Sequence, residues 1–135
     1  MFEVKILADS LSTVSNSRLT TLMMTYPRII HSEHLRHRMF SFNAASSRAI
    51  PVEKFIKQVE EDPFIPIHWG AAQKGMQAYN VLGQEDAAVC EMDWLLCRDE
   101  AVSRVKSMLH HGLHKQIANR LLEPWMWTTV ICSGT

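Results

Sequence analysis

The chain has 135 residues, of which 47% are hydrophobic, and its 14 Lys and Arg balance its 14 Asp and Glu. These values predict a single globular domain spanning residues 1–135. The balanced charge argues against nucleic acid or a membrane surface as a partner. Three widely spaced cysteines without a Cys-x-x-Cys pair argue against a disulfide framework or a zinc ribbon, and favour a reducing, cytoplasmic setting. Residues 1–10 lack the pattern of a signal peptide, and no apolar run is long enough to span a membrane.

The N-terminal third predicts two strands followed by a helix. Residues 2–7 alternate apolar and polar side chains, which is typical of a strand. Residues 10–17 are rich in Ser, Thr and Asn and predict a loop. Threonines among apolar residues predict a second strand over residues 19–26. Pro27 suits the first turn of a helix, which we expect to run to about Phe40.

The middle of the chain predicts a loop and then an amphipathic helix. Residues 41–50 are small and polar and predict an ordered loop. Pro51 opens the helix, and the prolines after residue 62 end it. The spacing of four apolar residues predicts a buried stripe on this helix: Val52, Phe55, Ile56 and Val59. Residues 68–80 contain two glycines and predict irregular structure.

The C-terminal third predicts two helices and a strand. Apolar residues recur at helical spacing over residues 84–111, and Gly112 ends this long helix. A second helix follows from residue 113 and ends near Pro124. Residues 125–132 are aromatic and β-branched and predict a buried strand.

Together these elements predict an α+β fold, with a mixed sheet flanked by long helices. The sheet combines strands from the N-terminal third and from the C-terminal end, in an order that the sequence does not define. Residues 133–135 have turn chemistry and end on a threonine suited to cap a helix. We therefore expect that the C-terminal part of the domain is missing.

Residues 36–48 form the densest polar segment, with three arginines, three serines, one histidine and one asparagine. An arginine fork matches a phosphate in a bidentate manner, and hydroxyl and backbone N–H groups add oriented donors. Ala44 and Ala45 let a ligand approach the backbone closely. The segment predicts an anion site, although a solvated helix end favoured by the helix dipole has the same composition.

Two other interpretations of the basic and histidine-rich residues are weaker. Three histidines lie three residues apart on the predicted first helix: His31, His34 and His37. Such spacing allows metal ligation, but surface histidines at a helix end are common, and we predict no metal site. A nucleic-acid binder could use four arginines: Arg28, Arg36, Arg38 and Arg48. The zero net charge and the lack of a neighbouring aromatic stacking motif argue against it.

Arg36-His37-Arg38, followed after seven residues by Ser46, resembles the signature of the flavin-dependent thymidylate synthases, the ThyX family. Further segments resemble a branch of this family that is often carried by bacteriophages: residues 25–28, 46–52, 62–70, 75–78 and 113–120. The resemblance covers essentially the whole chain and implies a ThyX-like fold.

The resemblance implies an enzyme of nucleotide biosynthesis that makes dTMP from dUMP. In this family methylenetetrahydrofolate supplies the carbon, reduced FAD supplies the hydride, and NADPH reduces the flavin. It also implies a homotetramer in the cytoplasm, which is the host cytoplasm if the gene is phage-borne. Family members use no cysteine nucleophile, and none of the three cysteines here lies in a basic motif that lowers a thiol pKa.

The resemblance also assigns site residues. Arg36, His37 and Arg38 fall on positions that hold the flavin, and Arg36 is also near the nucleotide. The expected dUMP-binding residues are Ser46 and Arg48, with Ser47 as a possible backbone donor and Glu33 where many members have a nucleotide-contacting Gln.

Three departures accompany these assignments. Ala44 stands where many members have a Glu that touches both ligands, and Thr129 stands where many have a nucleotide-binding Arg. The family's uracil-activating Arg and an Asn/Leu/Arg flavin contact follow the last predicted strand, so we expect both to lie beyond the end of this chain, and the resemblance assigns no catalytic residue within it. The alternative function is a non-catalytic, truncated remnant that acts as an oligomerising or ligand-binding module.

Overall fold

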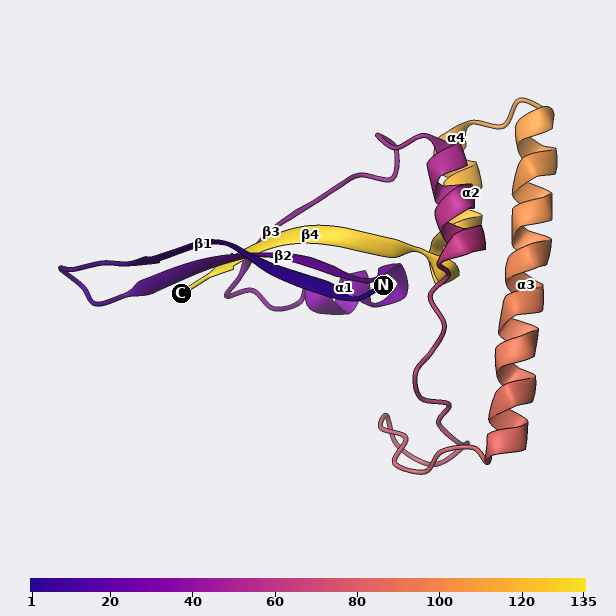
Figure 1. Ribbon diagram of the computed structural model, residues 1–135, viewed down its shortest axis with the longest axis horizontal. Helices are drawn as coiled ribbons and strands as arrows, with labels where there is room; N and C mark the ends of the chain where they lie inside the picture. The colour runs from indigo at the N-terminus through magenta and orange to yellow at the C-terminus, as the bar shows by residue number, and fades with distance from the viewer.

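Four strands form an antiparallel sheet in the computed structural model, which describes the whole chain (Figure 1). β1 (Glu3–Leu11) and β2 (Arg18–Pro27) form a hairpin, β4 (Trp127–Gly134) lies on the other side of β2, and β3 (Ser41–Ala44) is an edge strand beside β4. Every neighbouring pair is antiparallel, so the prediction of a mixed sheet was wrong. The short loop between β1 and β2 permits only antiparallel pairing, because parallel strands need a long crossover.

β1 and β2 are longer than their sequence patterns predict, and β4 is shifted by two residues. β1 continues to Leu11 and takes the first residues of the predicted loop 10–17. β4 starts at Trp127 rather than at residue 125, and it includes Ser133 and Gly134, which were predicted as a turn. These two residues pair with the threonines of β2, and the pairing holds them extended. The predicted strand 19–26 agrees with β2 to within one residue at each end.

The segment after β2 differs most from its prediction. Pro27 is the last residue of β2 rather than the first of a helix, and the helix expected up to Phe40 was wrong in extent. A 3-10 turn, η1 (Arg28–Ile30), leads into a four-residue helix, α1 (His31–His34). After α1 the chain runs back along the sheet and pairs with β4 as the edge strand β3. The first part of the predicted loop 41–50 is therefore a strand.

The helices in the second half of the chain agree better with prediction. α2 (Val52–Glu61) begins after Pro51, and all four residues of its predicted apolar stripe are buried. α3 (Gln84–His110) ends before Gly112, whose φ of +82° suits glycine. The second predicted helix is instead a short α4 (Lys115–Ala118) and a 3-10 segment, η2 (Asn119–Trp125).

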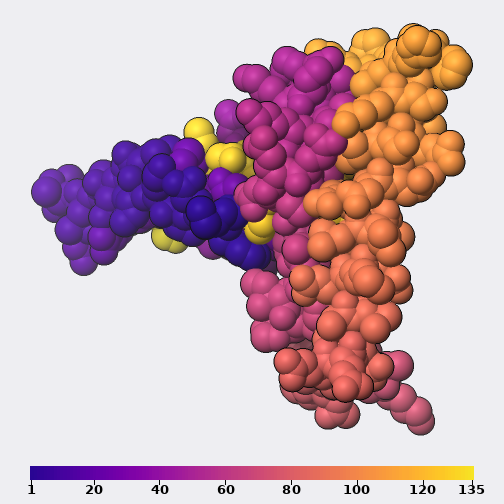
Figure 2. Space-filling model, turned by 45° about the vertical axis from the view of Figure 1, so that its right-hand side comes forward, coloured from indigo at the N-terminus to yellow at the C-terminus, as the bar shows by residue number.

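The core lies among the helices rather than under the middle of the sheet. Figure 1 shows α2, α4 and α3 grouped at one end of the sheet, and both views show the β1–β2 hairpin projecting away from them (Figure 2). The long helices therefore do not flank the sheet as expected, and α3 alone is long. Ten buried residues form the core cluster: Val52, Phe55, Ile56, Val59, Val102, Val105, Ala118, Leu122, Trp125 and Met126. None of the helices has both the length and the apolar character that crossing a membrane requires.

Candidate functional site

Overlapping turns after α1 place the Arg36–Arg38 segment on the surface. The backbone N–H of Arg36 donates to Glu33 O, and that of His37 donates to His34 O, both at 3.2 Å. The Arg36 guanidinium pairs with the Glu33 carboxylate at 3.2 Å, and both side chains are well exposed. Arg38 is exposed and forms no ion pair or hydrogen bond through its side chain. Two guanidinium groups are therefore presented to solvent beside the edge strand β3.

The loop between β3 and α2 holds the other candidate residues in a tight turn. The Ser46 hydroxyl oxygen accepts a hydrogen bond from the backbone N–H of Arg48 at 3.3 Å, and the Ala49 N–H donates to Ser46 O at 3.0 Å. Ser46 and Arg48 are exposed, whereas Ser47 is half-buried. The two candidate segments thus flank β3 on both sides. None of Arg36, Arg38 and Arg48 lines either of the two cavities described below.

Asn119, at the start of η2, ties this loop to the helical core. Its side-chain amide donates to Ser47 O at 3.0 Å, although the two residues are 72 positions apart. Asn119 is completely buried, and its Oδ1 has no hydrogen-bond partner. The sequence places Asn119 in a segment that resembles the ThyX family but gives it no role, and only its contact with Ser47 indicates one.

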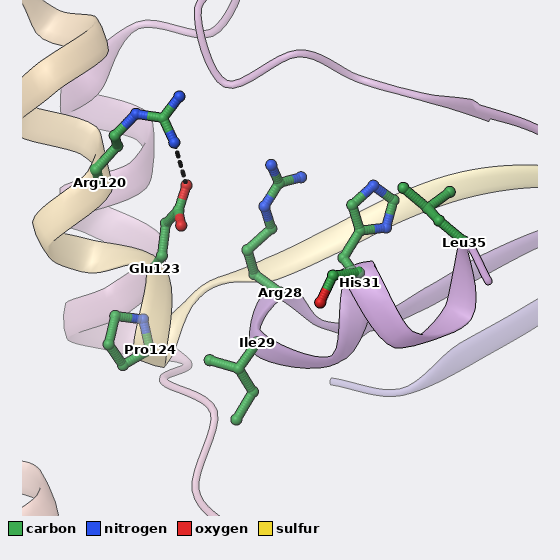
Figure 3. A pocket seen from close by; sticks show the side chains of 8 residues that line it. Arg28, Ile29, His31, Leu35, Arg120, Glu123 and Pro124 are labelled. Atoms are coloured by element: carbon green, nitrogen blue, oxygen red, sulfur yellow. Dashed lines mark ion pairs between the residues drawn. The ribbon is translucent and has the colours of Figure 1, made fainter.

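A polar pocket of about 470 Å³ lies between α1 and η2 (Figure 3). Arg28, His31 and Ser32 line one side of it, and Arg120 and Glu123 line the other. Arg120 pairs with Glu123 at 3.7 Å. The Arg28 guanidinium points into the space between Arg120 and His31 (Figure 3). The sequence placed Arg28 in a segment that resembles the ThyX family and in a candidate nucleic-acid surface, and no local pattern predicted its location at this pocket.

A second cavity of about 120 Å³ also lies beside Arg28. Its lining includes Arg28, Ala45, Ser47, Thr128 and Thr129. It therefore joins the loop predicted to bind dUMP to the start of β4. Arg28 lines both cavities.

The histidines of α1 have lowered pKa values. Burial lowers the pKa of His31, and the charges of Arg28 and His34 lower it further. Burial and the neighbouring His37 lower the pKa of His34. The His31 Nδ1 and the Tyr26 hydroxyl share a hydrogen bond of 2.7 Å, and burial raises the pKa of that tyrosine. Both histidines are therefore neutral at pH 7, and the arginines supply the positive charge of the region.

His34 and His37 make aromatic contacts. The rings of His34 and His37 lie 6.2 Å apart, and His34 also packs edge-on against Phe42. No three His, Cys, Asp or Glu side chains are arranged to hold a metal ion.

Thr129 contributes no cation where many ThyX members have an arginine. Side chains alternate along β4, so Thr128 is buried and Thr129 is exposed on the opposite face. The Thr129 hydroxyl is hydrogen-bonded to that of Thr25 at 2.9 Å. The Arg28 Nη1 donates to the hydroxyl of the neighbouring Thr128 at 3.5 Å. Arg28 therefore brings a guanidinium close to the start of β4, although β4 itself carries no arginine there.

Comparison of the sequence with models of known protein families and with curated proteins gives no match. The fold has close structural neighbours. Crystal structures of the UMP/dUMP methylase PolB from Streptomyces cacaoi, bound with 5-Br UMP or with 5-Br dUMP, superpose with a TM-score of 0.76. The match covers 100% of this chain and 72% or 73% of the neighbour, at 14% sequence identity. At this identity the likeness shows a shared fold, so the chain has the α+β fold of this UMP/dUMP methylase.

Proposed function

We propose that the chain is a flavin-dependent thymidylate synthase of the ThyX type, which methylates dUMP to dTMP with methylenetetrahydrofolate, FAD and NADPH. The observation that carries the proposal is the pair of basic segments, Arg36–Arg38 and Ser46–Arg48, on the two sides of the edge strand β3. The fold on which they occur is also that of a UMP/dUMP methylase. A homotetramer belongs to the same proposal.

The Ser46–Arg48 loop has the donors that a nucleotide phosphate needs. Arg48 offers an exposed guanidinium, and the Ser46 hydroxyl lies in the same turn. The Asn119 side chain donates a hydrogen bond to Ser47 O and so anchors the loop to the helical core. This contact restrains the Ser46 hydroxyl and the Arg48 backbone before a ligand binds. A preorganised loop loses less conformational entropy on binding, which favours affinity.

The Arg36–Arg38 turn fits the diphosphate of a flavin dinucleotide. Arg38 has no partner, and the pair between Arg36 and Glu33 is exposed, where such pairs contribute little to stability. Both guanidinium groups are thus free to bind phosphate oxygens, and we assign this turn, with His37, to FAD. Bound FAD, once reduced by NADPH, supplies the hydride. The residues of this chain bind and orient the ligands.

No cysteine lines either of the two cavities beside Arg28. All three cysteines are free. Burial raises the pKa of the Cys132 thiol, which disfavours its nucleophilic thiolate form. This arrangement supports a mechanism that forms no covalent bond between a cysteine and the nucleotide.

Visible absorbance of the purified chain with added FAD, with and without dUMP, tests the proposal. We expect a bound-flavin spectrum that shifts when dUMP is added. A turnover assay with methylenetetrahydrofolate and NADPH then measures separately whether this chain forms dTMP. UMP is titrated in parallel, because the structural neighbour is a methylase of both nucleotides. Arg38→Ala should weaken flavin binding, and Arg48→Ala should abolish dUMP binding while the flavin spectrum is retained.

Arg104→Ala is the matched control, because Arg104 is an exposed arginine of α3 whose partner is Glu100. It should leave both ligands bound. A folded chain that binds neither FAD nor dUMP contradicts the proposal. Binding of both ligands without dTMP formation supports the ligand-binding module instead.

A further inference from the structure

Arg28 is a half-buried arginine without an acidic partner. It follows the last residue of β2, where its backbone N–H donates to Met126 O at 2.7 Å and fixes its position beside β4. Its side chain makes one contact, at 3.5 Å, with the Thr128 hydroxyl. Glu123, the carboxylate that lines the same polar pocket, pairs with Arg120 instead (Figure 3).

The unneutralised charge of Arg28 points to an anionic ligand. Removing a guanidinium from water is unfavourable unless another group compensates its charge. One neutral hydroxyl at 3.5 Å compensates little. The charge of Arg28 also lowers the pKa of His31 beside it, so its field acts on the surrounding groups. A bound anion would remove this unfavourable charge.

The smaller cavity indicates which part of a ligand lies there. Its volume of about 120 Å³ is below the roughly 300–1,000 Å³ of small-molecule pockets, so it accommodates only part of a mononucleotide. Its polar lining combines the Arg28 guanidinium with Ser47 and Thr128. A phosphate matches both the size and these donors.

We propose that Arg28 binds the 5′-phosphate of the nucleotide in the smaller cavity, together with the Ser46–Arg48 loop. This assignment rests on the proposed function and adds a phosphate-binding residue to it. It also accounts for Thr129, which lines the same cavity but brings no positive charge to it. The arginine that the phosphate needs comes from η1, directly after β2, instead of from β4.

The test measures how much the phosphate contributes to nucleotide affinity. Isothermal titration gives the dissociation constants of dUMP and of deoxyuridine for the whole, FAD-loaded chain, and their ratio isolates the phosphate. Arg28→Met keeps an apolar stem and removes the charge, whereas Arg28→Lys keeps the charge and removes the planar fork. Arg104→Met is the control, since it removes the same charge from an exposed position that lines neither cavity.

We expect Arg28→Met to weaken dUMP binding roughly 10- to 100-fold, the range for one charged hydrogen-bonding partner, and to leave deoxyuridine binding unchanged. Arg28→Lys should lose part of the dUMP affinity, and Arg104→Met should lose none. The flavin spectrum and a thermal melt report whether each variant is folded.

The outcomes separate this inference from the proposed function. If the unmodified chain binds neither dUMP nor FAD, both are wrong. If it binds dUMP, and Arg28→Met keeps the ratio of the two dissociation constants, the Arg28 assignment is wrong and the proposed function stands. If Arg28→Met does not fold, Arg28→Lys decides, and an unchanged dUMP affinity in that variant overturns the assignment.

Discussion

A single buried amide connects the helical core to the candidate nucleotide loop. Asn119 donates to Ser47 O at 3.0 Å, while its own Oδ1 is buried without a partner. An unsatisfied buried acceptor costs about as much as one hydrogen bond contributes, so the residue adds little net stability. It is better explained by its effect on the position of Ser47.

Asn119→Leu tests this role, since leucine has a similar size and no polar atoms. We expect the free energy of unfolding to change by about 1 kcal/mol or less, because the lost hydrogen bond and the removed unsatisfied acceptor offset each other. The dUMP affinity should fall roughly 3- to 10-fold as the loop loses its anchor. Urea denaturation and dUMP titration measure the two effects. Gln116→Leu, at an exposed position of α4, is the control, and equal dUMP affinities in the two variants would contradict the anchoring role.

The two histidines of α1 make stability depend on pH. Their folded pKa values lie below the ordinary 6.5, chiefly because of burial. Between the folded values and 6.5, the unfolded chain therefore binds more protons than the folded chain. Stability contributed by neutral His31 and His34 is full above pH 6.5 and decreases as the pH falls through 6.5 toward their folded pKa values.

We expect a lower melting temperature at pH 5 than at pH 7.5, with the difference reduced in His31→Gln and His34→Gln. Thermal melts at the two pH values measure it. The Asp9 carboxylate does not interfere, because its hydrogen bonds with Arg18 and Thr20 lower its pKa to about 2. An equal loss of melting temperature in the unmodified chain and in both variants would assign the pH dependence to other groups.

At the scale of elements, η2 joins the helices to β4. It contributes Leu122 and Trp125 to the core, while its neighbour Leu121 is 42% exposed. The Trp125 indole N–H donates to Trp94 O in α3 at 3.1 Å, and the Trp94 indole N–H donates to Phe64 O at 2.8 Å. These contacts hold α3, η2 and the segment after α2 in one unit.

The neighbouring leucines of η2 offer a matched pair of variants. Leu122→Ala should lower the free energy of unfolding by about 2–5 kcal/mol, because it leaves a cavity at a completely buried position. Leu121→Ala should change it by only about 0.5 kcal/mol. Urea denaturation of both variants measures the difference, and similar midpoints would show that η2 does not pack as described.

At the scale of the whole molecule, the chain exposes more surface than a compact monomer of its size. Its accessible surface is 9731 Å², whereas a folded monomer of 15.5 kDa exposes about 7,200 Å². The projecting sheet and the separate helical layer account for this shape (Figures 1 and 2). One face of α3 also exposes an apolar stripe of Val89, Met92 and Leu96. We expect that other copies of the chain cover part of this surface in the proposed homotetramer.

Light scattering coupled to size exclusion tests this expectation. The unmodified chain should elute as an oligomer, and Met92→Glu combined with Leu96→Glu should shift it toward smaller species, since buried charges oppose association. Ser107→Glu adds a charge to the same helix about three turns beyond the stripe and should have a smaller effect. A monomeric unmodified chain would contradict the expectation, and an oligomer that survives the double substitution would place the interface on another face.

The sequence by itself determined the elements that depend on local pattern. The apolar period of α2 and α3 located both helices, because the side chains that share a helix face are three or four residues apart. The high content of arginine and serine located the basic segments around residues 36–48. Whether these segments bind FAD and dUMP stays a prediction.

Only the tertiary structure decided the arrangement of strands and the environment of the site. The order β1-β2-β4-β3 depends on hydrogen bonds between strands that are distant in sequence. The extended conformation of Ser41–Ala44 depends on pairing with β4, about 90 residues further along the chain. The contact of Asn119 with Ser47 and the location of Arg28 beside Thr128 span 72 and 100 positions. Local periodicity carries no information about such partners, because folding brings them together only after long stretches of chain have closed.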